Sequence, residues 1–272
     1  MSLAIFETRK WLSSPKPSVL DNVKIKCEEN LKLLITGSAG KLGQAICAKF
    51  ISENHEVIGL DLIDSDLQNS RYRHIQGNMN DQSQLMMALK DCDYVIHSAV
   101  YTGDYDNNLN AAFETNVLST FNMYECIRKL GKIKIVLLSS APVDKGIVTD
   151  SPFAWKSHSG KDHTYDLTKR LQEEIARDYA ETFGIQTIVL RLGHVVNGKN
   201  DSDFEGNPLN EVEYCLGGWV DKDDVASACI LATMHIGSNF EIFNVIGSHQ
   251  AQISFDTNRT AKVLGWQPKY RF

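Results

Sequence analysis

Residues 31–43, LKLLITGSAGKLG, constrain the fold of this chain more than any other segment. An apolar run breaks at Thr36, and three glycines, Gly37, Gly40 and Gly43, then open a segment with helical spacing. This pattern is typical of a strand, a tight turn and a helix. Glycines in such a turn let backbone N–H groups approach a pyrophosphate, and the positive end of the helix favours its charge. We therefore expect a dinucleotide site, although the glycine spacing departs from G-x-G-x-x-G and needs support from its context.

Asp61 supplies that context. It ends a second apolar run within residues 57–64, close to the distance of about 20 residues at which an acid accepts hydrogen bonds from ribose hydroxyls. A carboxylate there repels a 2′-phosphate, and Leu62 follows with no arginine before Arg71, which favours NAD over NADP. The alternative is that Asp61 only ends a strand in a turn.

Composition excludes several classes of protein. A net charge of −6 and a pI near 5.8 argue against a binder of nucleic acid, which would carry a basic patch. The chain shows neither a run of about 18 apolar residues nor a signal-peptide pattern, so we expect no membrane contact and a cytoplasmic location. The six cysteines lack C-x-x-C or metal-ligand spacing, which predicts reduced core thiols and no metal site.

Strand-like runs and helical periods alternate along the chain. The strand-like runs are residues 31–36, 56–61, 94–100, 133–140 and 185–193, and the helical periods are residues 41–53, 81–90, 107–130 and 162–183. Such alternation predicts an α/β fold with a doubly wound parallel sheet. We expect residues 1–30 to form an N-terminal extension and residues 31–272 to form a single domain.

Tyr165 and Lys169 are the candidate catalytic pair. Within residues 163–183, apolar residues recur every four positions and predict a core-facing stripe of Leu167, Leu171, Ile175, Tyr179 and Phe183. Tyr165 and Lys169 fall together on another face, because residues four apart are neighbours on a helix. A neighbouring ammonium favours the phenolate form of tyrosine, so the pair has the chemistry of a proton-transfer unit. Y-x-x-x-K is also common on solvated helices, which leaves a merely exposed pair as the alternative.

Several motifs in the right order resemble the extended short-chain dehydrogenase/reductase family, also called the NAD-dependent epimerase/dehydratase family. The resemblance covers residues 31–270. Besides the glycine turn, Asp61 and the Tyr165–Lys169 pair, it rests on GNMND at 77–81, HSA at 97–99, Asn116 in ETNVLST, LLSS at 137–140, LRLGHVVNG at 190–198, WVDKDDVASA at 219–228 and LGWQPKY at 264–270. It implies a Rossmann fold, an enzyme and NAD as the cofactor.

The resemblance also implies roles for particular residues. Ser140 would hydrogen-bond the reacting oxygen, Tyr165 would move the proton and Lys169 would hold the nicotinamide ribose. The implied cofactor-binding residues are Gly37, Ala39, Gly40, Lys41, Leu42, Gly43, Asp61, Leu62, Asn78, Met79, Ser98, Ala99, Val100, Asn116, Ser139, Tyr165 and Lys169.

Some of these positions have a structural alternative. His97 ends an apolar strand and is expected to be a packed, hydrogen-bonded histidine. Asn116 either bonds locally or holds the active-site helix. Ser139 and Ser140 are alternatively ordinary strand-end hydroxyls, and their register is open because the family's usual tyrosine and glycine after the serine are replaced within residues 142–145.

The substrate class is read from the C-terminal part. Little sequence follows Asp224, so we expect a small substrate-binding lobe, formed mainly by residues 193–218 and 236–272. Among compact relatives the chain looks most similar to uronate dehydrogenases. That resemblance implies that Arg191 binds a substrate carboxylate, a contact suited to its planar fork of donors. The alternative is a structural ion pair of Arg191 with Asp223 or Asp224.

These observations predict an NAD-dependent oxidoreductase that transfers hydride from a hydroxyl carbon of a small sugar-like substrate, with a uronic acid as one candidate. Uronate dehydrogenases carry Asn-His where this chain has Ala141 and Pro142, which leaves a less polar pocket. One alternative is a nucleotide-sugar epimerase or dehydratase with transient hydride transfer. Another is a dinucleotide-sensing regulator without catalysis. Relatives pair through the helix bearing the tyrosine, so a homodimer is expected.

Overall fold

A parallel sheet of seven strands forms the centre of the protein, in the order β3-β2-β1-β4-β5-β6-β9. The computed structural model describes residues 30–105, 107–141, 163–212, 218–249 and 255–272. The strands of the sheet are β1 (Lys32–Thr36), β2 (Glu56–Asp61), β3 (Tyr72–Gln76), β4 (Tyr94–His97), β5 (Lys134–Ser140), β6 (Thr187–Leu192) and β9 (Phe240–Val245). All neighbouring strands run parallel, so their carboxyl ends meet at one edge of the sheet.

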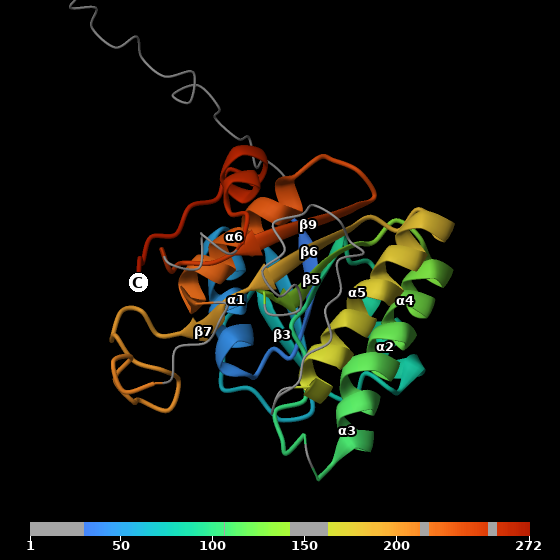
Figure 1. The fold of residues 1–272 in the computed structure, drawn as a ribbon. Coiled ribbons are helices and arrows are strands. Elements are labelled where there is room, and N and C mark those ends of the chain that lie inside the picture. Colours follow the sequence, from blue (N-terminus) through green and yellow to red (C-terminus); the bar gives the residue numbers. More distant parts are fainter. Residues whose placement is uncertain (1–29, 106, 142–162, 213–217, 250–254) are drawn as a thin grey trace, which may run out of the picture.

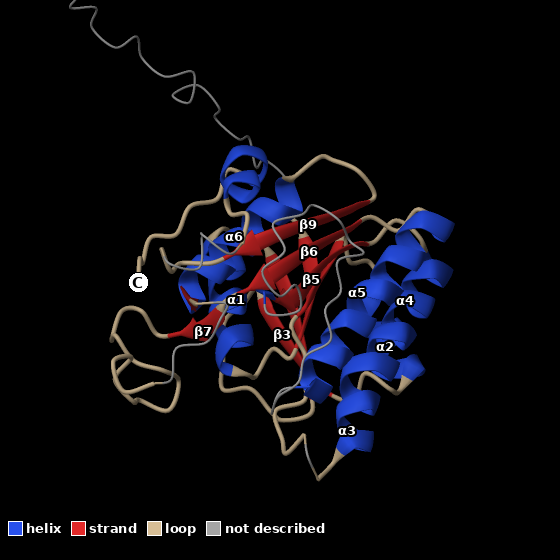
Figure 2. Cartoon of the chain, viewed as in Figure 1, coloured by secondary structure: helices blue, strands red, loops and turns tan. Residues whose placement is uncertain are grey.

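Helices cover both faces of this sheet (Figure 1). They are α1 (Lys41–Ser52), α2 (Gln82–Leu89), α3 (Leu109–Phe113), the π-helical turn η2 (Glu114–Leu118), α4 (Ser119–Leu130), α5 (His163–Phe183), α6 (Lys222–Met234) and the π-helical turn η5 (Thr260–Leu264). Helices α1 and α6 lie on one face, and α2, α4 and α5 lie on the other (Figure 2).

The alternation of side chains along the strands divides the core into two layers. In β1, Leu33 and Ile35 pack into the cluster with α1 and α6, whereas Leu34 packs into the cluster with α2, α4 and α5. All three side chains are fully buried. A strand buried on both faces reads as a continuous apolar run, as this one does. The predicted doubly wound parallel sheet is confirmed, and each predicted strand and helix overlaps an observed element.

Some elements differ from the sequence prediction, and others, including α6 and η5, were absent from it. Strands β3 and β9 were not predicted, and β9 lies at the edge of the main sheet although residues 236–272 were assigned to the substrate lobe. The helix predicted over 107–130 is divided into α3, η2 and α4. At the division Ser119 Oγ and Thr120 Oγ1 donate to carbonyls four residues earlier, a contact that bends helices.

A second sheet pairs β7 (His194–Val196) with β8 (Trp219–Asp221). Asp221 starts α6 by accepting hydrogen bonds from the amides of Asp223 and Asp224. The buried Asp224 carboxylate accepts from the amides of Lys269 and Tyr270 at 2.9–3.0 Å. The carboxylates of WVDKDDVASA therefore cap a helix and anchor the segment around Tyr270.

Residues 1–29, where an N-terminal extension was predicted, lie outside the described residues. The extension, the single domain and its lobe therefore stay predictions.

The four described cysteines are free and buried, as expected for core thiols: Cys47, Cys92, Cys126 and Cys229. Within the described part of the chain, no helix combines the length and apolar character needed to cross a bilayer.

Gly37 is expected to tolerate alanine less well than Gly265. Their φ angles are +69° and +74°, and a left-handed conformation costs an L residue about 1–2 kcal/mol. A Cβ on Gly37 would lie 2.8 Å from the backbone of Ala99, whereas one on Gly265 meets nothing within 4 Å. Urea unfolding should therefore give a larger loss of unfolding free energy for Gly37→Ala than for the control Gly265→Ala, and equal losses would contradict the close approach.

Candidate functional site

The glycine turn joins β1 to α1 at the carboxyl edge of the sheet. A Cβ on Gly43 would lie 2.0 Å from Gly37 O, so only glycine lets the helix pack on the turn. Gly40 is the N-cap of α1 and provides no side-chain cap, and the first turn of the helix holds no acidic residue. The backbone amides at this helix end are thus suited to an anionic group.

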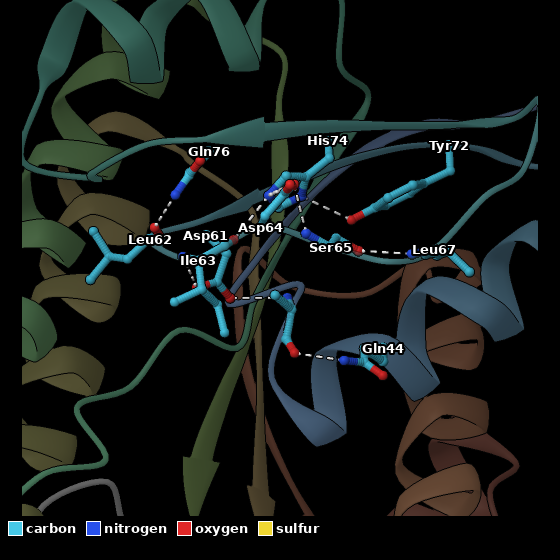
Figure 3. Close-up of polar contacts among 11 residues, drawn as sticks. Gln44, Asp61, Leu62, Ile63, Asp64, Ser65, Leu67, Tyr72, His74 and Gln76 are labelled. Atoms are coloured by element: carbon cyan, nitrogen blue, oxygen red, sulfur yellow. Dashed lines mark hydrogen bonds and ion pairs between the residues drawn. The ribbon is translucent and has the colours of Figure 1, made fainter.

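Asp61 lies beside this turn at the end of β2 (Figure 3). Its Oδ2 accepts from Ala39 N at 2.9 Å, and its Oδ1 accepts from Ile63 N at 3.3 Å. Figure 3 also shows two further hydrogen bonds, from Gln44 Nε2 to Ala39 O and from Gln76 Nε2 to Leu62 O. The carboxylate is therefore fixed next to the turn, as a ribose-binding acid must be.

The residues around Asp61 fit a dinucleotide. The side chains of Leu62 and Ile63 are 59% and 61% exposed, which leaves an apolar surface beside the acid. Neither side chain carries the positive charge that a 2′-phosphate requires. The turn, its helix end and this carboxylate form a cradle with the chemistry of an NAD site.

The segment after β4 lies against the same turn. Ser98 Oγ donates to Thr36 O at 2.6 Å, and Ala99 N donates to Thr36 Oγ1 at 3.3 Å. Ser98, Ala99 and Val100 are half-buried. The structure thus brings the predicted HSA segment to the edge of the cradle.

The other predicted cofactor residues lie around this edge. Asn78 N bonds to Gln84 Oε1 at 3.3 Å, and Met79 is buried in the core cluster beneath α2. Lys41 Nζ, in the first turn of α1, donates to Phe204 O at 2.5 Å. Leu42 is half-buried behind it. The loop that contains Phe204 therefore reaches the glycine turn from the second sheet.

His97 is the centre of a buried uncharged network. Its Nδ1 lies 2.8 Å from Thr36 Oγ1 and its Nε2 lies 2.9 Å from Thr120 Oγ1. Gln172 of α5 donates to the same Thr120 hydroxyl at 2.8 Å. Burial lowers the pKa of His97 to about 3, and the positive charge of Lys169 adds to this. His97 is therefore neutral and packed, as the sequence predicted.

Asn116 connects the loop after β4 to α5. Its Oδ1 accepts from Tyr101 N at 2.7 Å, and its Nδ2 donates to Tyr105 Oη at 3.2 Å and to Thr168 Oγ1 at 2.9 Å. The side chain is fully buried. This geometry supports the alternative in which Asn116 holds the helix that bears Tyr165, while contact with the cofactor stays a prediction.

Tyr165 and Lys169 lie together on α5. Lys169 Nζ is 6.0 Å from the centre of the Tyr165 ring, and it donates to Leu138 O at 2.9 Å. Tyr105 packs edge-on against Tyr165 at 5.7 Å between ring centres. Burial lowers the pKa of Lys169 to about 8, and the charge of Glu173 opposes that shift. The pair is thus anchored at the end of β5, where Ser140 lies.

Helix α5 meets the core partly through polar side chains, which corrects the predicted stripe. Its buried residues include Gln172 and Glu173, followed by Ala176 and Tyr179. Of the predicted stripe, Tyr179 is buried, whereas Phe183 is 49% exposed and the two leucines are half-buried. The polar side chains in the middle of the helix bond to neighbouring strands, and the apolar ones after them pack in the core.

Glu173 was missed by the sequence reading. It pairs with Arg191 of β6, whose Nε and Nη2 donate to the carboxylate at 3.0 and 2.8 Å. Ser139 Oγ donates to the same carboxylate at 2.5 Å. Arg191 thus has an ion pair with a partner other than the predicted Asp223 or Asp224. The sequence signal that points to Glu173 is its position four residues after Lys169, which places it one helical turn further on.

The sequence profile of the NAD dependent epimerase/dehydratase family matches residues 33–211. The uronate dehydrogenase of Pseudomonas putida is 26% identical over 245 residues, which cover 88% of this chain and 84% of that protein. A putative UDP-glucose 4-epimerase of Methanocaldococcus jannaschii is 28% identical over 184 residues, covering 65% of this chain and 60% of that protein. The chain thus spans less than two thirds of the second relative.

Solved structures share the fold. A variant uronate dehydrogenase of Agrobacterium tumefaciens in complex with NAD superposes with a TM-score of 0.69 at 20% identity, covering 88% of this chain and 84% of that chain. MoeE5 in complex with UDP-glucuronic acid and NAD gives a TM-score of 0.70 at 19% identity, covering 88% of this chain and 94% of that chain. These similarities confirm the Rossmann fold.

The fold, the glycine turn and the acid beside it are together typical of NAD-linked enzymes. By the profile match over residues 33–211, the chain belongs to the NAD-dependent epimerase/dehydratase family. The predicted family, the enzyme class and NAD as the cofactor are confirmed. Homologues act on uronic acids and nucleotide sugars.

The stability of the protein is expected to fall as the pH drops below 6.5, the ordinary pKa of histidine. The unfolded chain then takes up a proton that the folded protein excludes from His97 down to about pH 3. Urea unfolding at pH 7 and at pH 5 should therefore show that the wild type loses more unfolding free energy between the two pH values than His97→Asn does. The variant serves as the control because other histidines contribute equally to both proteins, and equal losses would show that His97 is not the group that titrates.

Proposed function

We propose that this protein is an NAD-dependent oxidoreductase that transfers hydride from a hydroxyl carbon of a small sugar-like substrate, with a uronic acid as one candidate. The observation that carries the proposal is the bond from Lys169 to Leu138 O. It fixes the Tyr165–Lys169 pair at the end of β5, two residues from Ser140. Groups suited to deprotonate an alcohol are thereby gathered at the edge of the sheet that also bears the NAD cradle.

The proposed reaction assigns one task to each side chain. Tyr165 as a phenolate takes the proton of the substrate hydroxyl, and Ser140 donates a hydrogen bond to the same oxygen as it becomes a carbonyl. Lys169 holds the nicotinamide ribose, and its ammonium favours the phenolate. NAD, held by the glycine turn and Asp61, supplies the hydride acceptor.

One comparison supports a small substrate, because the similarity to the Pseudomonas uronate dehydrogenase extends over 84% of that protein, whereas the similarity to the putative epimerase stops at 60%. The fold match to MoeE5, solved with UDP-glucuronic acid, covers 94% of that chain and keeps a nucleotide sugar as the alternative. A contact of Arg191 with a substrate carboxylate stays a prediction. Its geometry favours the structural alternative, because the side chain is 6% exposed and bonded to Glu173.

Replacing Tyr165 with phenylalanine is expected to abolish turnover and to spare NAD binding, because only the phenol oxygen is lost. Calorimetric titration with NAD and the rate of NADH formation measure the two effects. The matched control is Tyr94→Phe, whose hydroxyl bonds Thr233 O behind the sheet and which should keep the wild-type rate. Turnover retained by Tyr165→Phe would refute the assigned role.

A substrate panel separates the candidate functions. We expect NADH absorbance to rise with at least one uronate, aldose or hydroxy acid. A nucleotide-sugar epimerase or dehydratase would convert a UDP-sugar without net NADH. A dinucleotide-sensing regulator would bind NAD and convert none of them. Either of the last two outcomes replaces the proposal.

We also propose a homodimer formed through α4 and α5. An apolar groove formed by the end of α3, by η2, by the start of α4 and by α5 is lined by Phe113, Glu114, Val117, Leu118, Phe121 and Ile175. Phe121 and Leu118 are 43% and 45% exposed. Exposed apolar side chains gathered in one place are typical of a protein contact, and a second copy presents the same groove.

Phe121→Glu is expected to convert the dimer to a monomer, because a charge at the groove is costly to bury. Light scattering after size-exclusion chromatography measures the mass. The matched control is Ile236→Glu, at a side chain that is 92% exposed after α6, and it should remain dimeric. A wild-type protein that is monomeric at all concentrations would contradict the dimer.

A further inference from the structure

Three buried side chains connect α5 to the ends of β5 and β6. Glu173 accepts hydrogen bonds from Ser139 Oγ at 2.5 Å, from Arg191 Nε at 3.0 Å and from Arg191 Nη2 at 2.8 Å. The side chains of Glu173 and Arg191 are 2% and 6% exposed. These contacts fix the position of Glu173. Removing one partner of such a buried ion pair strongly destabilises the folded protein.

This cluster adjoins the proposed catalytic groups on two sides. Along the chain, Ser139 directly precedes Ser140 at the end of β5. On α5, Glu173 lies one helical turn after Lys169, whose Nζ bonds Leu138 O. Two successive turns of α5 therefore hold two successive residues of β5, and the next residue of that strand is Ser140.

Glu173 also acts on Lys169 through its charge, from one helical turn further along α5. The ionisable groups near Lys169 are Tyr165 and Asp166 one turn earlier on α5, Glu173 one turn later, His97 of β4 and, across Glu173, Arg191 of β6. His97 is uncharged because burial lowers its pKa to about 3. Burial lowers the pKa of Lys169 to about 8, and among the described groups Glu173 is the one that opposes this shift.

We propose that Glu173 is a positioning residue of this site. It holds Ser139, and with it the backbone that carries Ser140, and its charge keeps Lys169 an ammonium beside Tyr165. The role rests on the proposed function, in which that ammonium stabilises the phenolate. Glu173 itself does not touch the substrate.

The variant that tests the proposal is Glu173→Gln, which keeps the length of the side chain and removes its charge. Its matched control is Glu174→Gln, the neighbouring carboxylate, which is 52% exposed and pairs with Arg177 at the surface. The readout is the titration of the Lys169 ammonium in the protein without cofactor, followed through the pH dependence of the unfolding free energy and taken as the difference from the same protein carrying Lys169→Met. We expect this titration to move downward by about 1 pH unit in Glu173→Gln and to stay in place in Glu174→Gln. Turnover at pH 7 should fall with the lost ammonium.

A double variant separates this role from a purely structural one. Glu173→Gln combined with Arg191→Gln removes both buried charges, so the stability lost in Glu173→Gln should be largely recovered in thermal unfolding. The titration of Lys169 should remain displaced, because the carboxylate that opposes the effect of burial is still absent. Recovery of both the stability and the titration would overturn the proposal by showing that Glu173 acts only as the partner of Arg191.

The titration is independent of the proposed reaction. If the wild type forms no NADH with any substrate, the proposed function fails, and the position of the Lys169 titration in Glu173→Gln still decides whether Glu173 acts on the pair. An unshifted titration in a folded Glu173→Gln protein would overturn the inference even if the wild type turns over a uronate.

Discussion

The contact between the glycine turn and the backbone after β4 is the constraint on which the rest of the site depends. Gly37 lies so close to Ala99 that no side chain fits between them. The contact brings the end of β4 against the end of β1, where the carbonyl and hydroxyl of Thr36 are bonded by Ser98 and Ala99. His97 is thereby placed between two threonines, and the network continues to α5. The cofactor cradle and the helix with Tyr165 are thus linked through one chain of short contacts.

Helix α5 combines two kinds of interior. Through Gln172 it joins an uncharged network with His97, whereas through Lys169 and Glu173 it joins a charged one with Arg191. Buried charges need partners, so Lys169 and Glu173 are held at the ends of β5 and β6 by their bonds. Further along the helix, Ala176 and Tyr179 continue the contact with the core through apolar packing.

Local patterns in the sequence were sufficient for the fold and for the cofactor class. The runs around Leu34 and the glycines after Thr36 predict strand, turn and helix because each signal lies within a few residues. The position of Asp61 follows from the same unit. The ion pair of Arg191 was not predictable in this way, because its partner comes from a helix whose orientation depends on the whole sheet. Strand β9 was missed because, at the edge of the sheet, most of its residues are half-buried, so the segment lacks the continuous apolar run of the central strands.

The π-helical turn η2 limits the insertions and deletions that this site tolerates. A π-helical turn holds one residue more than an α-helical turn, and each residue rotates a helix by about 100°. Deleting a single residue within 114–118 would therefore restore regular winding and swing the Asn116 amide away from Tyr105 and Thr168, while rotating the α3 segment relative to Phe121. The extra residue couples the orientation of the amide that braces α5 to the orientation of the apolar groove, so an insertion or deletion here would alter both at once.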